Sequence, residues 1–232
     1  MKKTLASLLL LISFLLVSQK PTFAVTTVYF GKMVNGVGVG YDYSSAANPK
    51  LTGDLDTFVV NFTNISELKK VKVDIDYEFG KYTYLQGPPS MELWDLQVGF
   101  PVVNREKGLV YLTLGAHNYA ENTPFNPKHE TNGALVGVNI ACIPSDRFQI
   151  EADIQHSLGN LATAKLYYSD VTGTLSKTST LDLTILTMKA QIILTDNLGL
   201  AVRYRWFDEN ISDPRVDAVD LYSTTMGFIY RF

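Results

Sequence analysis

The last eleven residues constrain the fold of this chain more than any other stretch. Read backwards in steps of two they give Phe232, Tyr230, Phe228, Met226, Thr224 and Tyr222, while the alternate set is Arg231, Ile229, Gly227, Thr225 and Ser223. Because side chains on a strand point alternately to its two faces, this segment predicts a strand with one large aromatic face and one smaller, mostly polar face. The end of a soluble domain usually frays, so an amphipathic strand that reaches the last residue is atypical of one.

The first 24 residues have the pattern of a secretory signal peptide. Lys2 and Lys3 precede an apolar run from Leu5 to Val17, and Thr22-Phe23-Ala24 offers a small-x-small cleavage site. The run is shorter than the roughly 20 residues that a membrane-spanning helix needs. We therefore expect residues 1–24 to be a signal peptide cleaved after Ala24, and residues 25–232 to form one domain. An uncleaved N-terminal anchor is the alternative.

Composition excludes several classes of function. Without residues 1–24 the chain has 17 basic and 23 acidic residues, a net charge of −6, so no nucleic-acid partner is expected. Cys142 is the one cysteine, which excludes an intramolecular disulfide and a thiolate metal site. The histidines show no metal-ligand spacing, and no phosphate-binding loop is present, so neither a metal nor a cofactor is expected.

Strand-like alternation recurs along the whole mature chain. It is clearest in residues 70–80, where valine, isoleucine and aromatic residues alternate with charged ones. The alternation predicts ten strands, at about 28–43, 55–65, 70–85, 91–103, 109–121, 133–143, 148–169, 180–194, 198–207 and 218–232. Asn35-Gly36 could instead be a hairpin turn, and residues 148–169 could be a hairpin closed at Ser157–Asn160, so eight or twelve strands stay open.

The terminal strand and the alternation of short and long connections resemble bacterial outer-membrane β-barrel proteins. The resemblance implies an all-β fold, a closed antiparallel transmembrane β-barrel in the outer membrane of a Gram-negative-type cell. It implies contact with outer-membrane lipid and lipopolysaccharide, and with periplasmic chaperones and the barrel-assembly machinery, for which Phe228, Tyr230 and Phe232 would be the C-terminal signal. It leaves the oligomeric state open.

In such a barrel one face of each strand meets lipid and the other faces the lumen. Trp94, Phe100, Leu96 and Val98 on one predicted strand, and Val202, Tyr204 and Trp206 on another, are assigned to lipid. A ring of about ten strands is too narrow for a wide pore, so charged inward side chains should pair and fill it. The predicted lumen charge network is Lys72, Asp74, Asp76, Glu78, Asp95, Glu151, Asp153, Arg203, Arg205 and Arg231.

These features favour a non-enzymatic barrel, either a structural or adhesive protein or a narrow solute channel with a largely plugged lumen. One alternative is a lipid-modifying enzyme that uses His156 with Asp153 and Ser157, a set that resembles the His/Ser pair of barrel lipid A deacylases. That family spaces the two residues by one, whereas His156 and Ser157 are adjacent and should face opposite sides of a strand. Another alternative is a soluble periplasmic β-sandwich or lipocalin-like binder. Residues 122–132 and 208–217 are the expected recognition loops.

Overall fold

The structure, a computed structural model, describes residues 21–35, 55–66, 71–82, 91–121, 128–170, 173–213 and 219–231. Almost all of these residues lie in strands. The strands are β1 (Pro21–Asn35), β2 (Leu55–Ser66), β3 (Lys72–Tyr82), β4 (Met91–Arg105), β5 (Gly108–Glu121), β6 (Lys128–Ser145), β7 (Phe148–Ser157), β8 (Thr163–Asp170), β9 (Gly173–Ile193), β10 (Leu198–Ile211) and β11 (Val219–Arg231). A short 3-10 helix, η1 (Gly159–Leu161), separates β7 from β8. No helix in the described part of the chain is long and apolar enough to cross a membrane.

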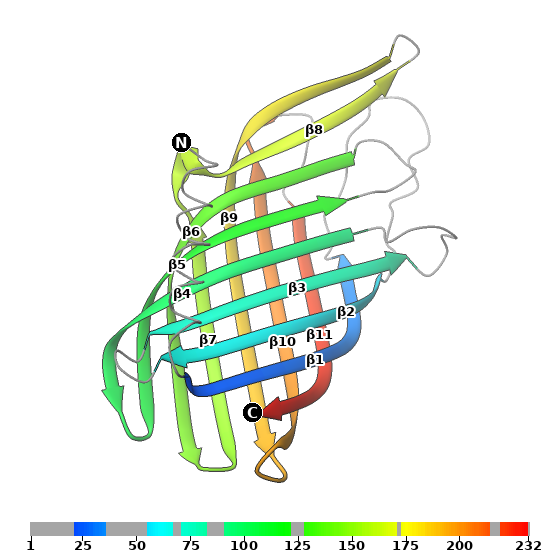
Figure 1. Cartoon of the computed structure of the whole chain (residues 1–232). Coiled ribbons are helices and arrows are strands. Elements are labelled where there is room, and N and C mark those ends of the chain that lie inside the picture. Colours follow the sequence, from blue (N-terminus) through cyan, green and yellow to red (C-terminus); the bar gives the residue numbers. More distant parts are fainter. Residues whose placement is uncertain are drawn as a thin grey trace.

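The strands form a closed antiparallel barrel (Figure 1). The ring closes between the two ends of the chain, where β1 and β11 pair from Val25 with Arg231 to Asn35 with Leu221. There are ten positions around the ring because β7 and β8 share one: both lie between β6 and β9. Closure satisfies the backbone hydrogen bonds that an open sheet edge would expose. The predicted ten-stranded barrel is confirmed, and an open two-layer sandwich is excluded.

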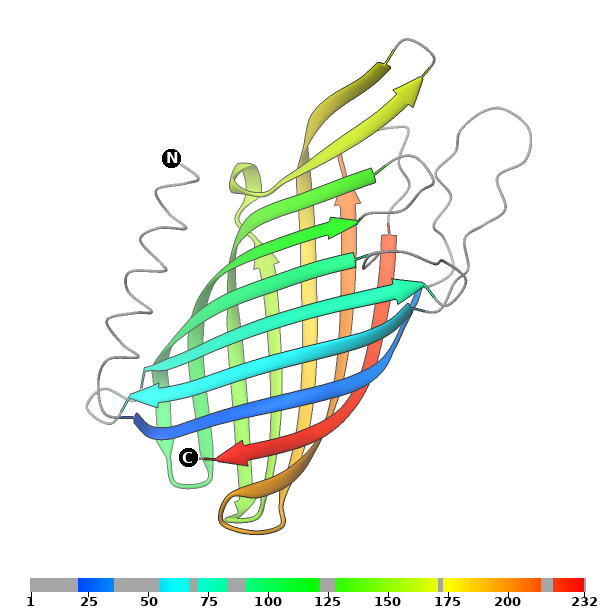
Figure 2. The same cartoon turned by 45° about the vertical axis from the view of Figure 1, so that its right-hand side comes forward.

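The junction of β7 and β8 settles the ambiguity in residues 148–169. His156 pairs with Thr184 on β9, and the next paired residue, Thr163, lies opposite Thr180. Between these two pairs the β7–β8 segment advances by seven residues, whereas β9 advances by four. The three extra residues form η1, which protrudes from the barrel wall (Figure 2). Gly159 has a φ of +47°, a conformation that favours glycine. The segment is one interrupted strand and not a hairpin, so the hairpin alternative is wrong.

Exposure along β11 follows the alternation seen in the sequence. Met226, Phe228 and Tyr230 are 66%, 65% and 51% exposed, whereas Thr225 and Ile229 are at most 1% exposed. The outward apolar face is therefore confirmed as far as Tyr230; the side chains of Arg231 and Phe232 lie outside the described part. On β4, Trp94 and Phe100 are exposed as expected, whereas Leu96 and Val98 lie in a buried cluster together with Val71, Val73 and Ala116.

Several strand boundaries differ from the predicted ones. β1 begins at Pro21, inside the expected signal peptide, and residues 36–43 of the predicted first strand lie outside the described residues. β6 begins at residue 128 and β9 at residue 173, in segments predicted to be loops. The sequence of β9 before residue 180 is rich in serine and threonine on both faces, because this part pairs with β8 in a hairpin that projects beyond the ring (Figure 2). It has no apolar alternation to reveal a strand.

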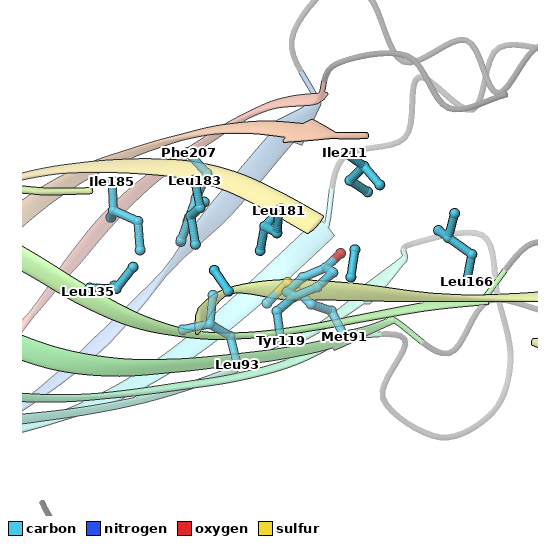
Figure 3. Packing of buried hydrophobic residues seen from close by; sticks show 12 residues of the cluster. Met91, Leu93, Tyr119, Leu135, Leu166, Leu181, Leu183, Ile185, Phe207 and Ile211 are labelled. Atoms are coloured by element: carbon cyan, nitrogen blue, oxygen red, sulfur yellow. The ribbon is translucent and has the colours of Figure 1, made fainter. Parts of the chain in front are cut away.

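The inward faces form three layers along the barrel axis. Toward the short turns between β4 and β5, β6 and β7, and β9 and β10 lies the lower cluster of Val59, Ile193, Ala201 and Ile229. A charged layer follows. At the opposite end lies the upper cluster (Figure 3), formed by Met91, Leu93, Tyr119, Leu135, Ala162, Ala164, Leu166, Leu181, Leu183, Ile185, Phe207 and Ile211. The lumen therefore contains one charged layer between two apolar layers.

Candidate functional site

The charged layer contains nine of the ten residues predicted for the lumen network. Strand alternation turns all nine inward, and each is at most 8% exposed. They are Lys72, Asp74, Asp76, Glu78, Asp95, Glu151, Asp153, Arg203 and Arg205. The tenth, Arg231, pairs with Val25 through the backbone, and its side chain is outside the described part.

Lys72 on β3 links three acceptors at one end of the network. Its Nζ lies 2.7 Å from Asp74 Oδ2 and forms a close ion pair with Glu151 on β7. It also donates a hydrogen bond of 3.4 Å to Asn139 Oδ1, and Asn139 Nδ2 donates one of 2.8 Å to Glu151 Oε1. β3 and β7 are four strands apart in the ring, so the Lys72–Glu151 pair crosses the lumen.

Arg203 and Arg205 on β10 make the corresponding cross-lumen links. Arg203 Nη1 lies 3.2 Å from Glu78 Oε2, and its Nη2 lies 3.6 Å from Asp76 Oδ2. Arg205 Nη2 pairs closely with Asp95 on β4, on the opposite side of the ring, and its Nη1 lies 3.8 Å from Glu78 Oε2. The Arg205 guanidinium also stacks 4.6 Å from the Phe207 ring centroid, which joins the charged layer to the upper cluster.

Amide and imidazole groups contact further carboxylate oxygens of the network. Gln97 Nε2 and Gln155 Nε2 donate to the two oxygens of Asp153 at 2.8 and 2.7 Å. His117 Nδ1 lies 2.6 Å from Asp95 Oδ1. A carboxylate taken out of water is costly unless it is paired and hydrogen-bonded. Each of these carboxylates has such partners, which explains how so many charges occupy a narrow interior.

Two small cavities lie among the described residues of the charged layer. One cavity of about 20 Å³ is bordered by Asp74, Asp95, Asp153 and Lys189, and another of about 20 Å³ by Lys72, Tyr111 and Gln191. A cavity needs roughly 10–15 Å³ to hold one water molecule. Each of these two therefore has room for about one water, and the upper and lower clusters lie beyond them.

Two buried charges of this region were missed from the sequence. Lys189 lies between Glu151 and Arg203 in the strand register and is 6% exposed, and Glu209 is 1% exposed. The spacing in the sequence is consistent with an inward position for both: Lys189 is two positions from Gln191, and Glu209 is four positions from Arg205. The apolar residues around them in β9 and β10 made this spacing hard to recognise.

The proposed set of Asp153, His156 and Ser157 is not brought together. Asp153 and Ser157 face inward, and Ser157 Oγ donates to Leu181 O and accepts from Leu183 N. His156 is on the outer face, with 58% of its side chain exposed. Its ring instead contacts two residues of β9: His156 Nδ1 lies 3.0 Å from Thr184 Oγ1, and His156 Nε2 lies 3.5 Å from Asp182 Oδ1.

His156 lies directly above the end of the outward apolar band. Ile154, Leu186 and Trp206 are register neighbours on β7, β9 and β10, and they end this band on all three strands. The next outward row is His156, Thr184 and Asp208, and the row after it contains Asp182 and Asn210. On β10 the band from Leu198 to Trp206 matches the 9–11 residues of a membrane-crossing strand.

A pocket opens on the outer wall above this boundary. Its volume is about 330 Å³, and it lies between η1, the middle of β9 and the end of β10; we call it the rim pocket. Thr180 and Ser212 close one side through a 2.6 Å hydroxyl–hydroxyl contact. The rim pocket is lined by His156, Ser157, Gly159, Asn160, Thr180, Leu181, Asp182, Asn210 and Ser212. No group of three or more histidine, cysteine, aspartate or glutamate side chains among the described residues could hold a metal ion.

Comparison with solved structures identifies the fold. Over 93% of this chain and 98% of the other, the chain resembles the outer membrane protease OmpT from Escherichia coli, with a TM-score of 0.54 and 12% identity. Neisserial surface protein A (TM-score 0.41, 11% identity, 90% and 97% coverage) and Ail from Yersinia pestis (TM-score 0.40, 12% identity, 90% and 99% coverage) are more distant. No protein-family model and no curated protein sequence matches the chain. The fold is that of bacterial outer-membrane β-barrel proteins.

Proposed function

We propose that this outer-membrane β-barrel protein is not an enzyme and does not form an open channel, and that it acts at the cell surface as a structural or adhesive protein. The observation that carries the proposal is the charged layer that crosses the lumen between two apolar clusters. Moving an ion along this path would require breaking paired, desolvated charges and entering apolar layers, both of which are costly.

The buried histidine of the lumen supports the non-enzymatic part of the proposal. His117 contacts Asp95, but it is 2% exposed, and Asp95 is also bound by Arg205. A substrate would have to displace both the upper cluster and these contacts to reach the imidazole. The protease activity in the name of OmpT belongs to that protein, and the shared fold does not transfer it.

The length of the strands supports a role outside the membrane. β9 has 21 residues, which span about 70 Å at roughly 3.3 Å per residue, whereas a barrel strand crosses the hydrocarbon with 9–11 residues. The β8–β9 hairpin therefore projects well beyond the apolar band (Figure 2). An epitope inserted at residues 171–172 should be labelled on intact cells, and labelling only after cell lysis would contradict this orientation.

Planar-bilayer recording tests the closed lumen. Purified protein whose heat-modifiable migration on gels shows that it is folded should add no steady conductance to a bilayer. Stable single-channel steps from the same folded preparation would contradict the proposal. A matched heat-denatured sample controls for detergent and contaminating porins.

A second candidate function is hydrolysis of an acyl ester in an outer-leaflet lipid, and the contacts of His156 with Thr184 and Asp182 favour it. His156 would take the Thr184 hydroxyl proton as the oxygen attacks the ester carbonyl, and would pass it to the departing alcohol; water would then release the acid from Thr184. Lipid profiles of cells that express the wild-type protein or His156→Ala decide this. Identical profiles would end the candidate.

A further inference from the structure

We propose that the rim pocket binds the neutral saccharide headgroup of a glycolipid in the outer leaflet. The inference depends on the outer wall of the barrel alone, so it holds whether or not the lumen conducts. It goes beyond the structural or adhesive role, because it names a site and a class of ligand.

The position of the rim pocket selects a membrane lipid as the source of the ligand. The pocket is on the outer wall, and His156 and Asp182 are in the first and second outward rows above Ile154, Leu186 and Trp206. Successive outward residues of a strand are about 7 Å apart along it. The pocket therefore lies at the depth of lipid headgroups and is reached from the side of the bilayer.

The bulge between β7 and β8 gives the pocket its outer wall. Leu158 N donates to Ala134 O and Ala162 N donates to Gly159 O, so η1 is fixed to β6 and closed on itself. Ala162 packs on Gly133, where an added Cβ would lie 2.8 Å from the Ala162 Cβ. Leu158 and Leu161 remain 38% and 37% exposed on either side of the turn, where acyl chains or the glycerol region could contact them. Bulges often occur beside functional sites.

The chemistry of the lining selects a neutral saccharide over a phosphate. The lining residues that the structure describes include a carboxylate, two amides, an imidazole and the hydroxyls of Thr180 and Ser212, and none of these described residues is a lysine or an arginine. Phosphate recognition usually requires arginine or lysine, and the Asp182 carboxylate would repel an anion. Sugar hydroxyls both donate and accept hydrogen bonds. They can donate to the carboxylate of Asp182 and to the amide oxygens of Asn160 and Asn210, and they can accept from the amide nitrogens of the two asparagines. A volume of about 330 Å³ is at the lower end of the range of ligand pockets, which suits one sugar ring.

Tryptophan fluorescence can report the binding directly. The chain has two tryptophans, Trp94 and Trp206, and Trp206 is in the row directly below Thr184. Trp94→Phe protein in phosphatidylcholine nanodiscs would carry Trp206 as its single reporter. Incorporation of a hexosyl diacylglycerol should give a saturable change in Trp206 emission. Matched nanodiscs with phosphatidylglycerol should not.

Two variants connect the signal to the pocket. Asp182→Asn removes one charged acceptor and should weaken binding by about tenfold, the value expected for one hydrogen bond to a charged group. Deletion of residues 159–161 removes the three extra residues and should abolish binding; heat-modifiability checks that the barrel still forms. Glu92→Gln is the matched control, because Glu92 is an exposed carboxylate on β4, away from the pocket.

Several results would overturn the proposal. An equal response to phosphatidylglycerol would show that a headgroup of another class, or the bilayer itself, changes the emission. Unchanged affinity in Asp182→Asn would remove the pocket from the interaction. A free methyl hexoside that binds as well as the glycolipid would show that the site takes soluble sugar, and the assignment to a membrane lipid would fail. None of these results bears on conductance, so the closed-lumen proposal would stand or fall separately.

Discussion

Replacement of Arg205 by methionine should strongly destabilise the barrel. Arg205 is 2% exposed and pairs with Asp95 and Glu78. Removal of one partner from a buried ion pair usually costs about 3–5 kcal/mol, because the other charge stays buried and uncompensated. Asp95 keeps its contact with His117, and Glu78 keeps Arg203. We therefore expect a loss near the lower end, about 3 kcal/mol.

The loss can be measured by reversible urea unfolding of the protein from lipid vesicles, followed by tryptophan fluorescence. Arg147→Met is the matched control, because Arg147 is exposed in the short turn between β6 and β7; its effect should stay within about 0.5 kcal/mol. Arg205→Met combined with Asp95→Asn should recover part of the stability, since no uncompensated carboxylate remains at position 95. Equal stability of Arg205→Met and Arg147→Met would refute the assignment of a desolvated, paired charge to Arg205.

Two further substitutions test the packing and the orientation of the wall. Gly137→Ala would place a Cβ 2.2 Å from Ile154 O and 2.9 Å from Thr113 Oγ1, so we expect a loss of about 1–3 kcal/mol, whereas Gly108→Ala, with open space at that position, should be nearly neutral in the same unfolding assay. Val202 is 46% exposed within the apolar band, so Val202→Lys should cost about 2–4 kcal/mol in vesicles, and a neutral effect would mean that this face meets water.

Most of the barrel could be predicted because the side chains of a strand alternate between its two faces with a period of two residues. On β3 and β7 each charged residue is two positions from the next, and this spacing alone placed Lys72, Asp74, Glu151 and Asp153 on the inner face. The aromatic face of β11 was found in the same way. Closure followed from the requirement that an apolar outer face leave no exposed sheet edge.

The remainder could not be predicted because it depends on contacts between distant segments. Leu93 and Phe207 each lie between one acidic and one large aromatic residue (Glu92 and Trp94, Asp208 and Trp206), so local alternation alone does not show that they face inward as part of the upper cluster. The contact of His156 with Asp182 and Thr184 requires the register of β7 on β9, which no local pattern specifies. The protrusion of η1 could be predicted only from the pairing with β9, where the seven residue steps from His156 to Thr163 lie opposite four steps of β9.

Cysteine reactivity at two adjacent residues of β11 tests the central claim most directly. In a Cys142→Ala background, Met226→Cys places the thiol on the outer face and Thr225→Cys places it inside. In folded protein in vesicles, we predict that neither position reacts with a charged, water-soluble maleimide until the protein is unfolded, because each thiol lies away from water and the reaction needs the thiolate. Rapid reaction of position 225 with the water-soluble reagent would show a water-filled lumen, and the same reaction at position 226 would show that the wall does not face hydrocarbon.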